Sequence, residues 1–273
     1  SSTQVQITIA ASAPTLYYYC TQHSGMGGAI NTNTTKGSSN FNGSIQSIVK
    51  ANTTAGFSII KYRGTGSAGA TVGHGLGVAP DVIVHKNRDD STGSFWSVYH
   101  KSAYNSASDP NIIYFNTNAA EADDTNILGT SVTIDSYKFS LGDYNGVNGS
   151  GDDMVSYCFS SVSGFSKFGE YVGNGAAVNG KFVFLGFRPA FIMQKRTDST
   201  GHWYIFDNKR NGFNVDNDSI SPNLPDSEYD VSIIDFLSMG FVWKTNAVAH
   251  NGSGGTYIYF AFSEAPFKYS RAR

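Results

Sequence analysis

The sequence predicts an all-β protein built from β-sandwich units. Charged residues make up only 15% of the 273 residues, whereas Gly, Phe and Tyr number 30, 19 and 16. Short apolar runs alternate with clusters of Gly, Asn, Ser and Thr, which is typical of strands joined by tight turns. Heptads and stretches rich in Glu, Lys and Ala are missing. The composition therefore disfavours a helical bundle or a coiled coil.

The N-terminal segment 1–50 is predicted to hold a β-hairpin followed by a linker. Gln4 to Ala10 alternates apolar and polar side chains, and Leu16 to Cys20 is a second strand-like run. Thr34 to Gly43 is rich in Ser, Asn and Gly, so it is predicted as turns or a linker. Ser44 to Ala51 leads into the rest of the chain.

The hairpin contains a spacing of metal-ligand types, Cys20-x2-His23-x2-Met26. Thiolate, imidazole and thioether are the ligands of blue-copper sites. The segment resembles the ligand loop of cupredoxins, which implies a partial cupredoxin-like module. A working copper site needs a second His from an earlier strand, and no His precedes Cys20. We therefore predict no metal and no cofactor, with copper at these three residues as the alternative.

The remainder is predicted to contain two similar units, 51–163 and 164–273. Gly56-Phe57-Ser58 begins the first unit, and Gly164-Phe165-Ser166 begins the second. Further matches follow in the same order: Tyr62 to Gly66 with Tyr171 to Gly175, Pro80 to Lys86 with Pro189 to Lys195, Ser91 to Gly93 with Ser199 to Gly201, Trp96 with Trp203, Asn148 to Gly151 with Asn251 to Gly254, and Tyr157 to Ser160 with Phe260 to Ser263. Such ordered self-similarity is typical of an internal duplication.

Each unit is predicted to be a β-sandwich of jelly-roll type. The predicted strands of the first unit are Val82 to Val84, Phe95 to Tyr99, Ile112 to Phe115, Tyr137 to Leu141 and Met154 to Phe159. Those of the second are Phe182 to Phe184, Phe191 to Met193, Trp203 to Phe206, Phe241 to Trp243 and Tyr257 to Phe262. Roughly seven strands in about 100 residues is typical of this architecture. Ile233 to Ser238 is a possible helix.

Charge and hydropathy exclude several classes of partner. The net charge is −2 with both signs scattered, so we expect no nucleic-acid binding. No apolar run approaches the roughly 18–20 residues that span a bilayer, so we expect no membrane insertion. Cys20 and Cys158 lie far apart and do not form a disulfide framework. The chain begins with Ser1 and without a signal-peptide pattern, which predicts a processed protein or part of a longer one.

No residue constellation in the sequence indicates catalysis. The Gly-x-Ser-x-Gly motif in its strand–turn–helix context does not occur, and the Gly-rich run from Gly73 to Gly77 lacks the Lys-Ser/Thr ending of a phosphate loop. We therefore predict a protein that is not an enzyme, with no catalytic residues. Trp96 and Trp203 are candidates for carbohydrate binding, because sugars stack on exposed aromatic faces. The alternative is that both pack in a core.

Several stretches carry a resemblance to a known group of proteins. They are Thr71 to Pro80, Gly164 to Phe168, Gly186 to Ala190, Lys195 to Gly201, Ile234 to Ser238, Gly254 to Phe262 and Pro266 to Tyr269. Through them, the region from Gly56 to Arg273 resembles an uncharacterised tandem-repeat domain of tail-fibre-like virion proteins from cyanophages and other marine phages.

The resemblance implies a virion structural protein of a phage tail fibre or host-attachment structure. It would act by display and multivalent binding, with other virion proteins, further copies of itself and a host surface glycan as expected partners. A capsid decoration protein and a glycan-degrading tail spike are the alternatives. The family supplies no catalytic residues.

Overall fold

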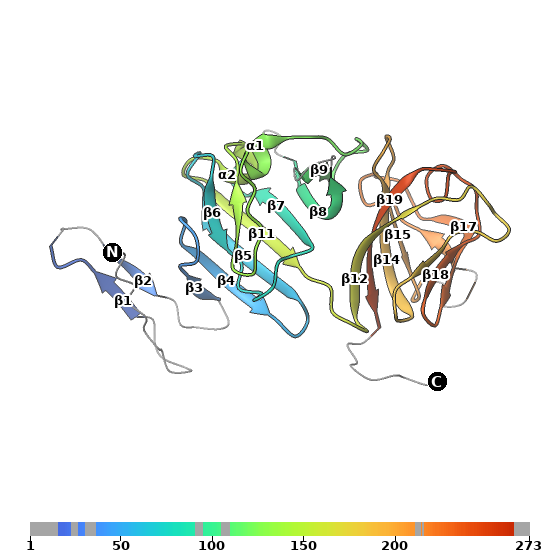
Figure 1. Cartoon of the computed structure of the whole chain (residues 1–273), viewed down its shortest axis with the longest axis horizontal. Coiled ribbons are helices and arrows are strands. Elements are labelled where there is room, and N and C mark those ends of the chain that lie inside the picture. The colour runs from blue at the N-terminus through green and yellow to red at the C-terminus, as the bar shows by residue number, and fades with distance from the viewer. Residues whose placement is uncertain are drawn as a thin grey trace.

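The computed structural model describes residues 16–22, 27–30, 37–90, 95–104, 110–210, 214 and 216–264. These residues form several antiparallel sheets and two single-turn helices, α1 (Thr125–Leu128) and α2 (Asn145–Asn148). The predicted all-β class with β-sandwich architecture is confirmed. The two sandwiches lie side by side along the long axis of the molecule (Figure 1). No helix in the described part of the chain is long and apolar enough to cross a bilayer.

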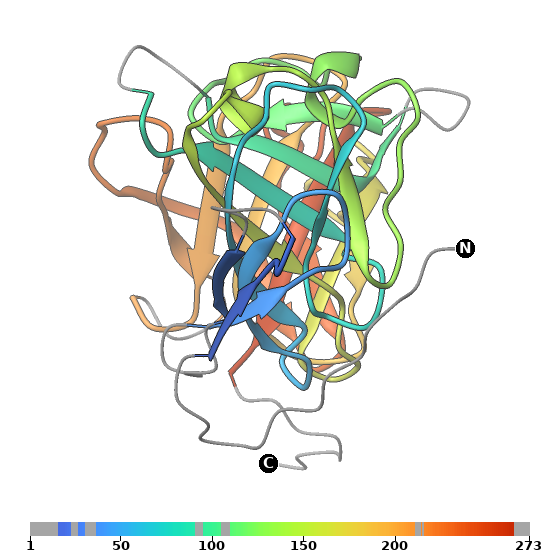
Figure 2. The same cartoon turned by 90° about the vertical axis from the view of Figure 1, so that its left-hand side faces the viewer.

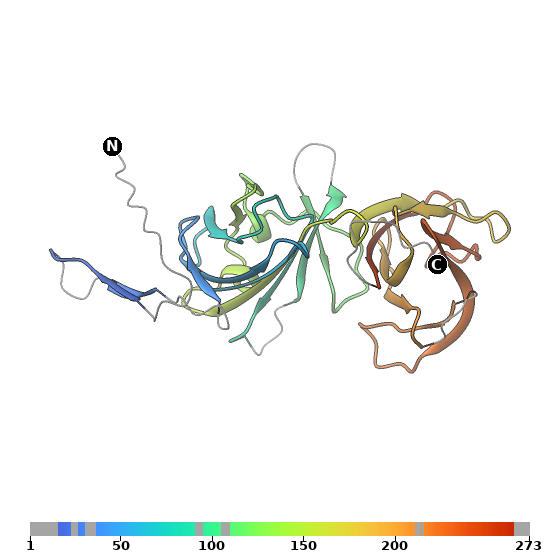
Figure 3. The same cartoon turned by 90° about the horizontal axis from the view of Figure 1, so that it is seen from below.

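An N-terminal hairpin is present, and it uses the predicted strand at Leu16 together with a strand that the sequence analysis did not predict. Strands β1 (Leu16–Tyr19) and β2 (Gly27–Ile30) pair antiparallel, with Leu16 opposite Ile30. The hairpin extends beyond the first sandwich at one end of the molecule (Figure 3), the end that faces the viewer in Figure 2. The predicted strand from Gln4 to Ala10 lies outside the described residues.

The first sandwich pairs a seven-stranded sheet, β3-β4-β5-β11-β7-β8-β9, with a two-stranded sheet, β6-β10. The strands are β3 (Ser38–Asn40), β4 (Ser47–Asn52), β5 (Phe57–Arg63), β6 (Ala70–Gly73), β7 (Val82–Asn87), β8 (Ser97–Tyr104), β9 (Pro110–Tyr114), β10 (Lys138–Leu141) and β11 (Asp153–Phe159). Alternation along β11 buries Met154, Ser156 and Cys158. This face packs against Val72 and Phe139 of the small sheet, forming the first core.

The second sandwich pairs two four-stranded sheets, β12-β19-β14-β15 and β13-β18-β17-β16. The strands are β12 (Ser166–Val172), β13 (Phe182–Phe184), β14 (Pro189–Arg196), β15 (Trp203–Asp207), β16 (Asp216–Ser219), β17 (Tyr229–Leu237), β18 (Gly240–Trp243) and β19 (Thr256–Ser263). Ile192, Phe206, Phe241 and Trp243 lie in the core between these sheets.

The prediction of a helix at Ile233 to Ser238 was wrong, because this segment lies mainly in strand β17. Ile234 and Phe236 are buried and alternate with more exposed neighbours. Ile234 pairs with Trp243 of β18 and with Asp216 of β16. The period-two burial and the two partner strands outweigh the local helical pattern.

The two sandwiches have corresponding strand orders. The order β5-β11-β7-β8 in the first matches β12-β19-β14-β15 in the second, and β6-β10 matches β13-β18. Tyr62 Oη donates to the carbonyl of Val147 at 2.6 Å, and Tyr171 Oη donates to the carbonyl of His250 at 2.7 Å. Corresponding positions of the predicted copies thus make corresponding bonds, while their origin by duplication stays a prediction.

A glycine in each Tyr-x-Gly-x-Gly turn allows a close backbone approach. A Cβ on Gly64 would lie 2.2 Å from the carbonyl oxygen of Gly149, and one on Gly173 would lie 2.3 Å from that of Gly252. Real Cβ atoms do not approach backbone oxygens this closely. The turn therefore requires glycine at this position in both sandwiches.

A third core joins the sandwiches to each other. Val82, Val84, Val98 and Ile113 of the large first sheet share a buried cluster with residues of the second sandwich, namely Phe168, Trp203, Ile258 and Phe260. Two backbone bonds across the junction reinforce it: Glu121 N–H to Thr197 O and Gly201 N–H to Asn118 O, both 2.9 Å. The two sandwiches therefore share a packed interface.

Candidate functional site

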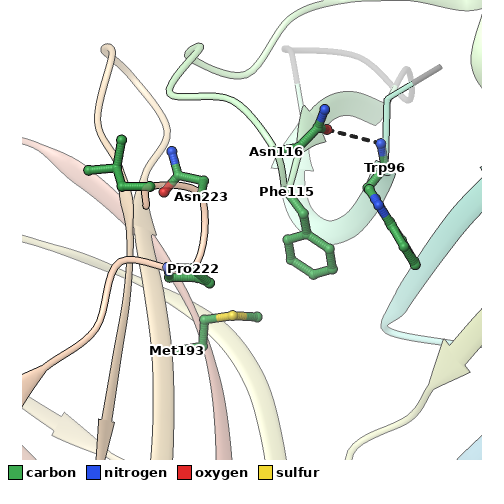
Figure 4. Close-up of a pocket in the computed structure, with 7 residues that line it drawn as sticks. Trp96, Phe115, Asn116, Met193, Pro222 and Asn223 are labelled. Carbon is green, nitrogen blue, oxygen red and sulfur yellow. Dashed lines mark hydrogen bonds between the residues drawn. The ribbon is translucent and has the colours of Figure 1, made fainter. Parts of the chain in front are cut away.

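A groove of about 480 Å³ opens at the junction of the two sandwiches. Its lining comprises Trp96, Phe115 and Asn116 from the first sandwich, and Met193, Pro222, Asn223 and Leu224 from the second. Phe115 and Met193 point into the space between the two walls (Figure 4). None of these side chains is charged, so the groove combines apolar surface with amide groups from both sides.

Two asparagines fix the backbone beside the two tryptophans. The backbone N–H of Trp96 donates to Asn116 Oδ1 at 3.0 Å, and the backbone N–H of Trp203 donates to Asn223 Oδ1 at 3.0 Å. In each pair, the asparagine follows the tryptophan by 20 residues. The two sandwiches therefore position a tryptophan and an amide side chain in the same way.

The second tryptophan is buried, which removes it from the carbohydrate-binding candidates. Trp203 has no exposed surface, and its indole Nε1 donates to the carbonyl of Tyr114 at 2.9 Å. The ring of Phe115 meets it edge-on, with 4.8 Å between centroids. For Trp203, the core-packing alternative is the one that the geometry supports.

The first tryptophan is 36% exposed and lines the groove. The residue before each asparagine also differs, being Phe115 in the first sandwich and Pro222 in the second. The Phe115 ring covers Trp203, whereas the small ring of Pro222 leaves the groove open beside Trp96. The two candidates therefore occupy similar backbone positions but only one can meet a ligand.

The wall of the second sandwich is held by further polar contacts. Asn223 Nδ2 donates to His202 Nδ1 at 3.0 Å, so both ends of this amide are engaged. Behind it, Lys195 Nζ donates to the carbonyl of Gly201 and lies 6.0 Å from the Trp203 ring centroid. Burial lowers the pKa of Lys195 to about 8. These contacts order one wall of the groove before any ligand binds.

The histidines of the described chain do not assemble a reactive site in the groove. Burial lowers the pKa of His85, His100 and His250 to about 3, so these side chains are neutral near pH 7. His85 Nδ1 lies 2.8 Å from Ser156 Oγ, but both residues are fully buried. A substrate cannot reach this pair without unfolding the first core.

The copper motif falls only partly within the described residues. Cys20 is half-buried and forms no disulfide within the described part of the chain, whereas His23 and Met26 lie outside the described ranges. Among the residues with described positions, no group of three or more His, Cys, Asp and Glu side chains is arranged to hold a metal ion. The absence of metal therefore stays a prediction for the motif itself.

Sequence reasoning found Trp96 but missed the residues around it. Asn116 and Asn223 carry a usable signal, because each follows a matched tryptophan at the same spacing. Met193 and Pro222 have no such signal in the sequence, since they line the groove only because of how the two sandwiches meet.

Comparison with known proteins identifies one family. A family described as a domain of unknown function (DUF7483) matches residues 30–266, a stretch that includes both sandwiches. Neither a curated protein nor a solved structure matches the chain.

Proposed function

Because the chain belongs to the DUF7483 family of domains of unknown function, we propose its function from its site and its sequence resemblance. The protein is a non-catalytic structural component of a phage virion, in a tail fibre or another host-attachment structure. It displays the groove beside Trp96 to a glycan on the host surface.

The groove carries this proposal. An exposed indole face, apolar walls and an amide on each side are suited to a sugar, which has apolar ring faces and hydroxyl edges. Oδ1 of Asn116 is used by the Trp96 backbone, and its Nδ2 group has no partner among the described residues, so it remains as a donor for a hydroxyl. The shared core holds the two walls in register, which reduces the entropy lost on binding.

We also propose that the two sandwiches arose by duplication. The corresponding strand orders, tyrosine bonds and asparagine–tryptophan pairs support this origin. A duplicated scaffold that opens one groove gives one modest site per chain. Several chains in one attachment structure would raise the overall affinity through avidity.

Location on the particle is tested by antibody labelling of intact virions, followed by electron microscopy. Label on the tail or its fibres supports the proposal. Label spread over the capsid surface supports a decoration protein instead, and virions without label contradict a virion role.

Glycan binding is tested with the full chain and host-envelope polysaccharide in a co-sedimentation assay. Trp96→Ala should lower the bound fraction at least fivefold, because it removes the stacking face. Tyr137→Ala is the matched control, since Tyr137 is 62% exposed and does not line the groove. Equal binding by wild type and Trp96→Ala contradicts the assigned site, and release of oligosaccharides supports the tail-spike alternative.

A further inference from the structure

Three aromatic side chains form a row on the outer face of the large first sheet. The rings of Trp96 and Tyr157 lie 6.5 Å apart at an interplanar angle of 22°. The rings of Tyr157 and Phe57 lie 6.4 Å apart at 9°. Trp96 is exposed, and the other two are partly exposed, so the row leads across the sheet to the groove.

Strand register explains why the three rings share a face. Phe57 pairs with Phe159, and Tyr157 lies two residues before Phe159 on the same strand. Ser97 pairs with His85, and both side chains are buried in the sandwich, so the preceding Trp96 points to the opposite face. The row is therefore a consequence of strand pairing in the sheet.

The corresponding face of the second sandwich has a different ring geometry. There Trp203 meets Phe260 at 68°, and Phe260 meets Phe168 at 88°. These edge-to-face contacts are typical of a packed core, and all three rings are buried in the junction. The near-parallel rings of the first sandwich lie at the margin of the junction, where Tyr157 packs against the shared core and is only partly buried.

Three lysines lie on the same face of the sheet as the rings. Lys50 pairs with Ile59, which pairs with Tyr157 on the next strand. Lys61 and Lys86 both pair with Val155, on either side of it. Cross-strand partners share a face, so all three ammonium groups belong to the face that carries the row.

Lys50 and Lys61 are the exposed lysines among these three, and Lys61 is paired with a carboxylate. Lys61 Nζ contacts Asp153 Oδ2 at 3.1 Å, and the side chains are 50% and 33% exposed. An ion pair this open is weak and readily exchanged. In a chain of net charge −2, the face is a local site of positive charge suited to an anionic ligand.

We propose that the aromatic row and the groove form one extended site for a linear acidic glycan, a polysaccharide containing uronic acids. Successive sugar rings stack on Phe57, Tyr157 and Trp96, and carboxylates along the chain meet the lysines. This inference rests on the proposed attachment function and adds the class of glycan and its direction across the sheet. The separation of neighbouring rings is close to the length of one hexose unit, which favours a chain over a single sugar.

Titration calorimetry with the full chain tests the proposal. The probes are oligogalacturonates of two and six units, and neutral cello-oligosaccharides of the same lengths. We expect the acidic hexamer to bind at least tenfold more tightly than the acidic dimer and the neutral hexamer, and its affinity to fall as salt is raised.

Variants separate this inference from the groove itself. Phe57→Ala should weaken binding of the acidic hexamer about fivefold and leave the dimer unchanged, because only the longer chain reaches this ring. Lys50→Gln should weaken the acidic hexamer about threefold and leave a neutral hexamer unchanged. Tyr137→Ala is the control for removal of an exposed aromatic.

The outcomes of these experiments test the extended acidic site separately from the attachment function. Binding of neutral and acidic hexamers with equal affinity, or no effect of Phe57→Ala and Lys50→Gln, overturns the extended acidic site. The attachment function survives that outcome if Trp96→Ala still lowers binding to host polysaccharide at least fivefold. No binding by any of the four oligosaccharides also overturns the extended site, whereas the co-sedimentation assay decides the attachment function separately.

Discussion

Phe115 packs edge-on against Trp203, with 4.8 Å between ring centroids and an interplanar angle of 69°. One residue lies just after β9 in the first sandwich and the other begins β15 in the second. The contact closes one side of the junction, while the other side remains open as the groove beside Trp96. The site and the stability of the junction therefore depend on the same small set of rings.

Phe115→Ala should lower the free energy of unfolding by about 3 kcal/mol, because it removes a large ring from the shared core. Urea denaturation followed by tryptophan fluorescence and by far-UV circular dichroism measures this change. We also expect the two transitions to separate, since the junction couples the sandwiches. Coincident transitions with unchanged midpoints would contradict the role of Phe115.

Pro222→Phe should close the groove. The new ring would stand before Asn223 as Phe115 stands before Asn116, and it would cover Trp96. We expect glycan binding to fall at least tenfold with little change in stability. Co-sedimentation and a thermal melt measure the two effects, and retained binding by a folded variant would argue against this groove.

Asn223→Ala should destabilise the protein more than Asn116→Ala. Both substitutions remove an acceptor from a tryptophan backbone N–H, but Trp203 is buried and Trp96 is exposed to water. A buried donor left without a partner costs about 1–3 kcal/mol, whereas water can replace the acceptor at the exposed position. Chemical denaturation of the pair gives the difference, and equal losses would contradict the argument.

Stability should fall as the pH falls from about 6.5. Burial lowers the pKa of His85, His100 and His250 to about 3, whereas these groups titrate near 6.5 in the unfolded chain. Between these values the unfolded state binds more protons, so the free energy of unfolding rises with pH. Each histidine contributes a slope of up to about 1.4 kcal/mol per pH unit.

Denaturation at several values between about pH 5 and pH 7 measures this slope. Paired carboxylates contribute mainly below this range, because the pKa of Asp153, which bonds to Lys61, is lowered from its ordinary value of 3.8. His85→Gln should make the slope shallower. A free energy of unfolding that does not change over the range would contradict burial of the neutral imidazoles.

Gly64→Ala should destabilise the first sandwich by about 2 kcal/mol or more, because its Cβ would meet the carbonyl oxygen of Gly149 at 2.2 Å. Gly201→Ala is the control, since the nearest atom to its Cβ would be Arg196 Cβ at 3.3 Å. The difference in unfolding midpoint between the two variants measures the effect. Equal midpoints would show that the turn can relax.

The sequence determined the all-β class, most strand positions and the exposed or buried alternation along them. These properties depend on local periodicity and turn residues, as in β11, where every second residue is buried. The local pattern suggested a helix at Ile233 to Ser238, whereas pairing with β16 and β18 makes most of this segment a strand. The matched positions of Trp96 and Trp203 were also visible in the sequence.

Only the tertiary structure decided that the two tryptophans have different environments. Phe115 of the first sandwich covers Trp203 across the junction, whereas Trp96 lines the groove that it shares with Pro222. The alignment of Phe57, Tyr157 and Trp96 likewise depends on the register of four strands, β5, β11, β7 and β8. A sequence pattern reports the periodicity of one strand, whereas packing between distant segments determines which of its side chains remain open to a ligand.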